Sequence, residues 1–469
     1  MKPRKFRSVI AGVLVSAGLS AATPVGAATS SVSLTLPSGA AVAAMSCVPG
    51  GTCVVATNLV GPVTPWSSGP FGGGVEITLT SMTSTGQVQL GQSEEVLGTG
   101  YDVEALQCFT ATSCIAAGHF AGADGTARAF VASELGGVWS PEFLPGIPAA
   151  APYSPAVQLS CVGPRLCGLV VSNINADLSS STFSVVMVNG VWQAPRNLPL
   201  NPGQTGSHEV AGVSCWAGGC TFVGDFYSVD TTDTYLAGTK RWTSALGSGN
   251  TSVNAVSCQS DGTCLVVGVG TLAILHDGIV KSVHAMPTPP GAEAVWGLWL
   301  PGDRASCLSV PDVCVVDAVA PFRTHNGMQT LQATATIVTN LRQANPRIGV
   351  PVLVDPGVAT SSIGAVTCSS VRRGFACGVS GNGSKQMNGG GWMPFFTTFD
   401  GHKWQRQWGG APPTSQRLID TSSLIAGTTD ARGRVLFAAY CSLIDGINSS
   451  SSGYYINYLK TVTVAPSTL

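Results

Sequence analysis

Short apolar runs, each broken by a cluster of turn residues, recur along the chain and predict β-strands joined in hairpins. Ala255–Cys258 (AVSC) is followed by a turn containing Ser, Asp and Gly, and then by Cys264–Gly268 (CLVVG). The same order returns in Val213–Cys215 and Cys220–Gly224, on either side of a turn of small residues. An apolar run, a turn and a second apolar run are the signature of a hairpin.

Cysteines mark these hairpins. Fourteen of the 15 cysteines fall into close pairs, and only Cys441 is left over. The pairs are Cys47/Cys53, Cys108/Cys114, Cys161/Cys167, Cys215/Cys220, Cys258/Cys264, Cys307/Cys314 and Cys368/Cys377. A loop of about five residues places the flanking strand residues opposite each other, at a Cα separation that a disulfide can bridge. Zinc is the competing interpretation, but the C-x2-C spacing is missing and the pairs belong to separate repeats. We therefore expect local disulfides, no metal and no cofactor.

A glycine-led turn followed by tryptophan is a second recurring element, downstream of the cysteine hairpins. It recurs in four repeats, at Gly137–Trp139, Gly190–Trp192, Lys240–Trp242 and Asp400–Trp404, and Asp277–Ile279 and Thr85–Val88 look like degenerate copies. We expect this turn to join a third strand to a fourth. The repeating unit then consists of four short strands.

The length of the unit predicts a β-propeller. Successive first cysteines are 61, 53, 54, 43, 49 and 61 residues apart, which is the scale of a four-stranded blade and too long for a leucine-rich or β-helix repeat. An eighth unit without a cysteine pair is expected around residue 421. The predicted fold is all-β, a propeller of about eight four-stranded blades with seven as the alternative, and a hairpin disulfide in each of seven blades. Leu34–Pro37 resembles the outer strand of other units, so the N-terminal strand should complete the last blade.

The first 27 residues are typical of an export signal. Ser8–Ala22 is apolar, and Val25–Ala27 supplies the small residues of a cleavage site. The basic residues ahead of them are Lys2, Arg4, Lys5 and Arg7. Because the apolar stretch is short for a membrane span and no later segment looks transmembrane, we expect residues 1–27 to be removed as a signal peptide. Residues 28–469 would then form one propeller domain that is secreted or associated with the cell envelope, in an oxidising compartment.

Charged residues are scarce. They make up 10% of the chain, and the net charge is -1. No basic field is present to hold a phosphate backbone, so nucleic acid is excluded as an expected partner.

At these residues the chain resembles the secreted bacterial β-propellers of the sialidase-like, Asp-box group. In that group a Ser/Asp-Gly-x-Trp turn joins the third and fourth strands of a blade. Asp400–Trp404 comes nearest to the box, whereas Gly137–Trp139 and Gly190–Trp192 lack the aspartate. The paired-cysteine hairpin is also similar to that of secreted actinobacterial repeat proteins. The resemblance covers most of the mature chain and implies the fold rather than an activity.

A sialidase would need clustered arginines, an activated Tyr/Glu pair and a general acid. Its Phe-Arg-Ile-Pro motif is matched only in part, by Phe322–Thr324 and Arg347–Pro351. The spacing of the acidic residues selects no carboxylate pair for glycoside hydrolysis, and nucleophile-elbow, zinc-helix and Walker motifs are absent from the sequence. We therefore predict no catalytic residue.

Three weaker groups of candidate residues have plainer structural explanations. His208–Glu209 pairs a histidine with an acid in a loop segment. A series of aspartates could hold calcium or form a solvated turn, and its members are Asp225, Asp230 and Asp233. Three tryptophans outside the blade register could stack on a sugar or a peptide, and they are Trp216, Trp296 and Trp299.

The repeats keep the hairpin cysteines, turn glycines and blade tryptophans that the fold needs, and no set of catalytic groups stands out. We therefore expect a monomeric extracellular binding or scaffold protein, whose partner is an unknown extracellular protein or glycan. A divergent, sialidase-like glycoside hydrolase is the alternative. Convergence of Arg, Tyr and acidic side chains on one face would distinguish the hydrolase.

Overall fold

The computed structural model describes most of the chain in separate segments. They are residues 29–33, 40–60, 71–82, 88–150, 155–174, 180–197, 209–225, 231–238, 241–246, 253–268, 270–292, 304–323, 329–343, 345–355, 360–371, 374–384, 392–408, 418–429, 435–445 and 454–464. The predicted signal peptide, residues 1–27, lies outside the described residues.

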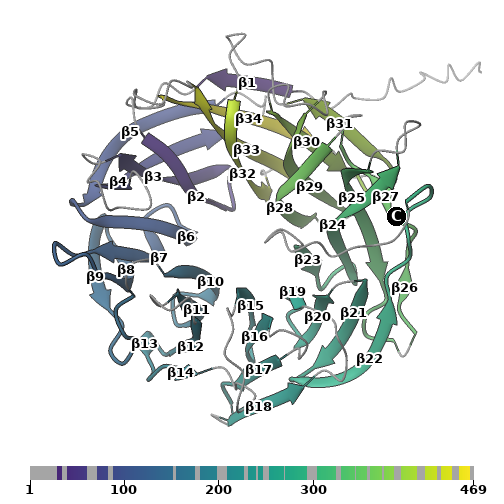
Figure 1. The fold of residues 1–469 in the computed structure, drawn as a ribbon, viewed down its shortest axis with the longest axis horizontal. Helices are drawn as coiled ribbons and strands as arrows, with labels where there is room; N and C mark the ends of the chain where they lie inside the picture. The colour runs from purple at the N-terminus through teal and green to yellow at the C-terminus, as the bar shows by residue number, and fades with distance from the viewer. Residues whose placement is uncertain are drawn as a thin grey trace, which may run out of the picture.

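The described residues form eight antiparallel sheets, arranged as blades around a ring and containing no helix (Figure 1). Within a sheet, the strands follow one another up and down in chain order from the centre of the ring outward. Each sheet has four strands, or five where the outer strand is interrupted. This is the all-β propeller architecture that the repeat pattern predicts. We number the blades in chain order.

The first four blades contain strands β2 to β18. Blade 1 consists of β2 (Ala40–Val48), β3 (Thr52–Val60), β4 (Phe71–Met82) and β5 (Val88–Leu97). Blade 2 consists of β6 (Tyr101–Thr110), β7 (Ser113–Ala121), β8 (Ala127–Leu135) and β9 (Val138–Phe143). Blade 3 consists of β10 (Ala156–Gly163), β11 (Leu166–Ile174), β12 (Ser180–Val188), β13 (Val191–Trp192) and β14 (Arg196–Asn197). Blade 4 consists of β15 (Glu209–Trp216), β16 (Gly219–Asp225), β17 (Thr231–Leu236) and β18 (Arg241–Leu246).

The remaining blades complete the ring. Blade 5 consists of β19 (Val253–Cys258), β20 (Thr263–Gly268), β21 (Thr271–His276) and β22 (Ile279–Ala285). Blade 6 consists of β23 (Ala305–Leu308), β24 (Val313–Arg323), β25 (Gln329–Thr339), β26 (Arg347–Ile348) and β27 (Val352–Leu353). Blade 7 consists of β28 (Thr360–Val371), β29 (Gly374–Ser384), β30 (Trp392–Phe399) and β31 (Trp404–Trp408). Blade 8 consists of β32 (Leu418–Thr429), β33 (Val435–Asp445), β34 (Tyr454–Val464) and β1 (Thr29–Ser33).

Up-and-down order gives the ring two different ends. At one end, here called the hairpin face, the first strand of a blade turns into the second and the third turns into the fourth. At the other end, here called the loop face, the second strand leads to the third and each blade leads to the next. The glycine-led turns that we predicted between third and fourth strands lie at the hairpin face, where Gly136 and Gly137 join β8 to β9.

Seven disulfides lie at the hairpin face, one in each of blades 1 to 7. Each bridges register-paired residues of the first and second strands, with Cα atoms 3.9–4.1 Å apart. They join Cys47 to Cys53, Cys108 to Cys114, Cys161 to Cys167, Cys215 to Cys220, Cys258 to Cys264, Cys307 to Cys314 and Cys368 to Cys377. Every bridge is local to its own hairpin, as the repeat spacing predicts.

Blade 8 has the same hairpin without a cysteine pair. Thr429 and Val435 are its last register-paired residues before the turn. They are six residues apart in sequence, like the cysteines of blade 1. Cys441 lies farther along β33, in register with Ser423 and Tyr458.

The N-terminal strand closes the ring. Strand β1 pairs with β34 along its whole length, from Thr29 opposite Val462 to Ser33 opposite Tyr458. The closure is of the kind that we predicted, but Thr29–Ser33 carries it, and Leu34–Pro37 lies outside the described residues. The last sheet is therefore built from both ends of the chain (Figure 1).

The core lies between blades and is built from small aliphatic side chains. Along β3, Val54 and Ala56 are buried in the cluster shared with blade 2, whereas Val55 is buried against Leu436 and Ala438 of blade 8. Because successive side chains of a strand point to opposite faces of the sheet, one strand contributes to the cores shared with both neighbouring blades. The blade tryptophans Trp139, Trp192 and Trp404 pack against these clusters.

Candidate functional site

A serine before the first cysteine connects neighbouring blades near the hairpin face. At five junctions, the backbone N–H of a first cysteine donates a hydrogen bond to the serine Oγ of the previous blade, over 2.9–3.0 Å. The serine and cysteine partners are Ser46 and Cys108, Ser160 and Cys215, Ser214 and Cys258, Ser257 and Cys307, and Ser306 and Cys368. The Ser-Cys pair of the sequence repeat therefore joins blades as well as closing hairpins.

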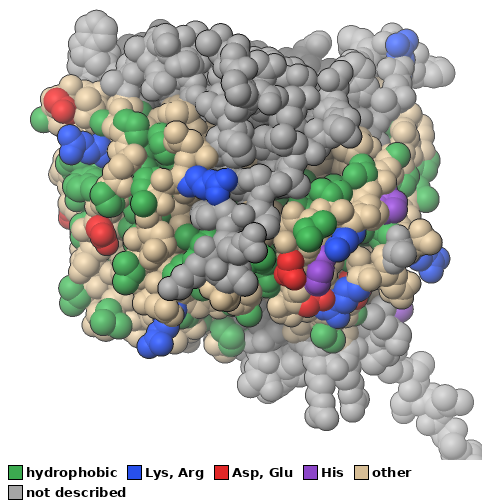
Figure 2. Space-filling model, turned by 90° about the horizontal axis from the view of Figure 1, so that it is seen from below, with side chains coloured by type: hydrophobic (Ala, Val, Ile, Leu, Met, Phe, Trp, Pro, Cys, Tyr) green, Lys and Arg blue, Asp and Glu red, His purple; other side chains and the backbone are tan. Residues whose placement is uncertain are grey.

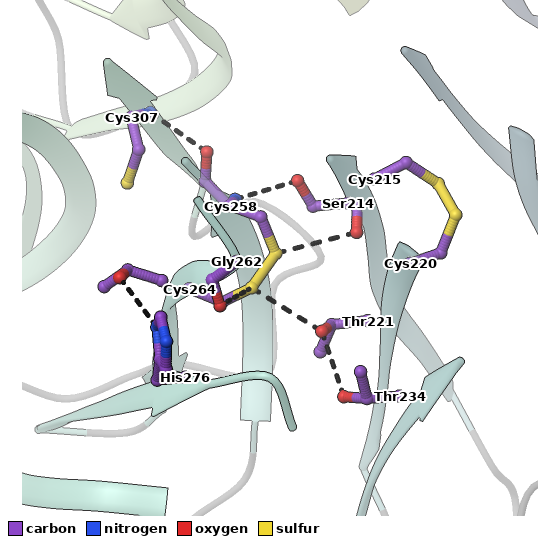
Figure 3. Close-up of a disulfide and its surroundings, with 12 residues drawn as sticks. Ser214, Cys215, Cys220, Thr221, Thr234, Cys258, Gly262, Cys264, His276 and Cys307 are labelled. Atoms are coloured by element: carbon purple, nitrogen blue, oxygen red, sulfur yellow. Dashed lines mark hydrogen bonds between the residues drawn. A yellow bond between two sulfur atoms is a disulfide. The ribbon is translucent and has the colours of Figure 1, made fainter. Parts of the chain in front are cut away.

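Figure 3 shows one of these junctions, between blades 4 and 5. Ser214 reaches the backbone of Cys258, and the Thr221 hydroxyl lies 3.5 Å from Cys264 Sγ and 3.0 Å from the hydroxyl of Thr234. Thr221 and Thr234 are fully buried. The polar groups of this junction are occupied by the fold and offer nothing to a ligand.

A different contact joins blades 1 and 2 toward the loop face. The side-chain amide of Asn58, on β3, pairs with both backbone groups of Val103 on β6. Val103 N–H donates to Asn58 Oδ1 over 2.9 Å, and Asn58 Nδ2 donates to the Val103 carbonyl over 3.0 Å. Both residues are buried. A neutral amide therefore clamps the start of the next blade.

At the next junction, an ionisable group occupies the equivalent place. His119 stands five residues after the second cysteine of blade 2, as Asn58 does in blade 1. Its Nδ1 lies 2.9 Å from Glu104 Oε1, and its Nε2 lies 3.4 Å from Asp102 Oδ2. The other Glu104 oxygen accepts a hydrogen bond of 2.7 Å from the backbone N–H of Val157, on blade 3. The three side chains together therefore connect blade 2 to blade 3.

A β-bulge explains how Glu104 reaches the next blade. The register of β6 against β7 shifts between Val103 and Ala105, which leaves Glu104 as the extra residue. A bulge redirects the side chain of the extra residue. Four other first strands shift at the same distance before their cysteine, leaving out Ala43, Ala211, Asn254 and Gly364. Of these five bulged residues only Glu104 is ionisable, so the other four strands cannot make the same contact.

Burial and charge act in opposite directions on His119. Burial lowers the pKa of the imidazolium, but the hydrogen bonds and negative charges of Asp102 and Glu104 outweigh burial and raise the pKa from 6.5 to about 9. At neutral pH the ring is therefore a cation that donates to both carboxylates. The side chain of Asp102 is only 4% exposed, and its Oδ1 has no hydrogen-bond partner.

The cluster is poorly suited to acid–base catalysis near neutral pH. A general base must be unprotonated there, whereas His119 holds its proton until about pH 9. Both carboxylates are turned toward the imidazolium, and Glu104 also holds the Val157 amide. The arrangement is instead that of a structural contact between blades.

The two candidate arginines do not form a clamp. Arg323 pairs with Gln329 at one end of β25, and Arg347 pairs with Thr339 at the other end. The two lie at opposite faces of blade 6, because a strand rises about 3.3 Å per residue. Both side chains are exposed.

Trp216 is a structural residue rather than a stacking platform. Only 4% of its surface is exposed, and it belongs to the core cluster between blades 4 and 5. A Cβ added at Gly262 would lie 2.9 Å from its indole nitrogen. Nothing in the sequence distinguishes a tryptophan next to a cysteine turn from an exposed one, so its position in the cluster emerges only from the fold.

The other weak candidates remain predictions. Trp296, Trp299, His208 and Asp230 lie outside the described residues, and the side chains of Asp225 and Asp233 are not described. Within the described segments, no group of three or more His, Cys, Asp or Glu side chains could hold a metal ion.

The side of the molecule seen in Figure 2 carries isolated charges rather than a charged field. Figure 2 shows acidic and basic side chains spread singly among polar and hydrophobic ones, with one mixed group at the right. One exposed ion pair joins Arg342 Nε to Asp261 Oδ2 at 2.6 Å. In the part of the chain that the structure describes, no helix is long and apolar enough to cross a membrane.

Comparison with known proteins adds similarity at the level of fold only. No protein-family model and no curated protein matches the chain. Among solved structures, the Dos1 propeller covers 90% of this chain and 95% of its own, with 9% identity and a TM-score of 0.44. YCF48 bound to D1 peptide covers 78% and 93%, with 10% identity and a TM-score of 0.39. A neuraminidase-like protein of A/flat-faced bat/Peru covers 91% and 87%, with 9% identity and a TM-score of 0.39.

Proposed function

We propose that this protein is secreted and binds an extracellular protein or glycan through its loop face, without turning over a substrate. The observation that carries the proposal is the unequal character of the two faces. The hairpin face consists of tight turns, and seven of them are closed by disulfides. The loop face has the longest connections of the ring, such as residues 144–155 and 286–304, although short ones also join β5 to β6 and β20 to β21. Function on a rigid scaffold resides in its longer loops.

The disulfides and the N-terminal sequence support export. Seven disulfides fit an oxidising compartment. Strand β1 begins at Thr29, directly after the predicted signal peptide, so cleavage near Ala27 would leave the closing strand whole. Mature protein would then fold with its last blade complete.

Binding is favoured over glycoside hydrolysis by the state of the acidic groups. Hydrolysis requires one carboxyl group as an acid and a second as base or nucleophile. Asp102 and Glu104 lie close together at the loop end of blade 2, but both are engaged by His119. The arginines that could hold a sialic acid carboxylate lie at opposite ends of blade 6.

An experiment on orientation tests the proposal. A biotin-acceptor peptide is inserted either between Asp124 and Gly125, at the loop face, or between Gly136 and Gly137, at the hairpin face. Each oxidised protein is fixed through its biotin and probed with a panel of sialylated and neutral glycans and with secreted proteins of the same culture. Protein held by its hairpin face should bind a member of the panel, and protein held by its loop face should bind it much more weakly.

Turnover is measured in parallel with aryl glycosides, including sialosides, at several pH values. No hydrolysis is expected. Hydrolysis that disappears when one loop-face carboxylate is changed to its amide would overturn the proposal in favour of the hydrolase. Equal binding in both orientations would exclude the loop face as the binding surface.

A further inference from the structure

We propose that His119 is a protonation-controlled latch between blades 2 and 3. As an imidazolium it holds Glu104 against the backbone of Val157, and loss of its proton to the solvent releases this contact. The proposal concerns the ring itself and does not depend on what the protein binds.

The geometry makes Glu104 dependent on His119. One Glu104 oxygen accepts from His119 Nδ1 at 2.9 Å while the other accepts from Val157 N–H at 2.7 Å. A neutral imidazole has only one N–H, so it cannot donate to both Asp102 and Glu104. Deprotonation would leave one carboxylate facing a bare ring nitrogen, in a site where only 12% of the His119 side chain is exposed. Repulsion between buried lone pairs then favours separation of the groups.

Among the described residues, the only charged side chains paired with His119 are acidic, so none of them can replace the lost proton. The groups facing His119 from β6 are Asp102 and Glu104, and both are acidic. Its register partner on β8 is Ala129. Blade 3 presents the uncharged N–H of Val157. The two acidic groups raise the pKa of His119 to about 9, so the latch is closed at neutral pH and opens in alkaline solution.

The Asn58 junction is a built-in control. It makes the corresponding contact, to Val103, with a side chain that does not titrate. The two junctions lie in consecutive blades, and the second has Asp102, Glu104 and His119 where the first has Ala41, Ala43 and Asn58. A difference in their response to pH can therefore be assigned to this ionisable group, and a variant of His119 isolates the part of the imidazole.

The test follows hydrogen exchange at two backbone amides of the intact, oxidised protein. Exchange of Val157 and Val103 is measured by NMR across the alkaline range, and each is corrected for the intrinsic effect of pH. Protection of Val157 should fall about tenfold from one pH unit below to one above the His119 pKa. Protection of Val103 should stay constant. Parallel loss at both amides, or no loss at either, would overturn the latch.

A variant and a second readout guard against misfolding. His119→Asn places at this junction the residue found in blade 1, and it should remove the pH dependence of Val157 exchange. Titration of the His119 ring in the unaltered protein, followed by NMR, should show its midpoint near pH 9. A midpoint near 6.5 would show that the carboxylates do not hold the proton, and would overturn the proposal whatever the variant does.

Discussion

Gly118 shows how closely single residues are fitted at the start of blade 2. It lies on β7 opposite Val103, next to His119. A Cβ at this position would be 1.9 Å from the carbonyl oxygen of Asp102, which belongs to the backbone and cannot move aside cheaply. The missing side chain therefore allows the bulged strand β6 to approach β7.

Replacing this glycine tests that fit. Gly118→Ala should lower the free energy of unfolding by about 1–3 kcal/mol through overpacking. Gly163→Ala is the matched control, because no atom lies within 4 Å of its added Cβ, and it should change the free energy by less than about 0.5 kcal/mol. Chemical denaturation of both variants measures the difference. Equal stability of the two would contradict the close approach at Gly118.

The sequence predicts the cysteine chemistry at residue scale but not the His119 cluster. A disulfide across a short turn depends on neighbours in the chain, so spacing alone identifies Cys47 and Cys53 as partners. The contact of Glu104 with Val157 spans 53 residues and depends on a bulge that leaves no mark in the composition. The only available signal was the position of His119, which repeats that of Asn58 five residues after a second cysteine.

At the scale of the hairpin, blade 8 can be used to test whether its first hairpin can hold a disulfide as the hairpins of the other blades do. Thr429 and Val435 are register-paired on either side of the turn and have the same separation in sequence as Cys47 and Cys53, so we expect them to accept a hairpin disulfide. The double variant Thr429→Cys, Val435→Cys should form an eighth disulfide and stabilise the protein by about 2 kcal/mol. Cys441→Ser serves as the background and control, because it removes the unpaired cysteine. Intact mass and thiol alkylation report the bridge, and two alkylated thiols in the double variant would refute this expectation.

The four-strand unit could be predicted because turn chemistry and strand patterning are local. The glycine-led turns at Asn189–Gly190 and Asp277–Gly278 join third to fourth strands, and these residues have positive φ. Trp216 was harder to place because burial depends on the adjoining blade. The sequence shows that it is outside the blade register, but only the fold brings Gly262 against it.

For the whole molecule, closure by β1 should control both stability and solubility. A variant chain that begins at residue 34 lacks β1 and exposes the edge of β34. An exposed edge pairs readily with other chains, so this variant should unfold at a lower temperature and self-associate. Deletion of residues 465–469, beyond the end of β34, is the control and should change neither. Calorimetry and light scattering compare them, and an N-terminal deletion as stable and monodisperse as the control would contradict closure by β1.

The ring could be predicted from the repeat length, whereas its closing segment could not be fixed to the residue. Leu34–Pro37 matches the Leu-Pro pattern of other outer strands, but the closing ladder is made by Thr29–Ser33, a mostly polar segment. An edge strand contributes mainly backbone hydrogen bonds, so its side chains carry little signal. The binding specificity that we propose would be equally hidden, because it would belong to the long connections rather than to the repeat.

Non-reducing peptide mapping of the oxidised protein tests the central claim most directly, since the whole account depends on cysteines that pair within their own blades. The account predicts seven linkages, each inside one hairpin, from Cys47–Cys53 to Cys368–Cys377. Reduction should convert each to a pair of alkylated cysteines in the same peptide region. Bridges between cysteines of different blades would contradict the propeller, because they would require another strand topology.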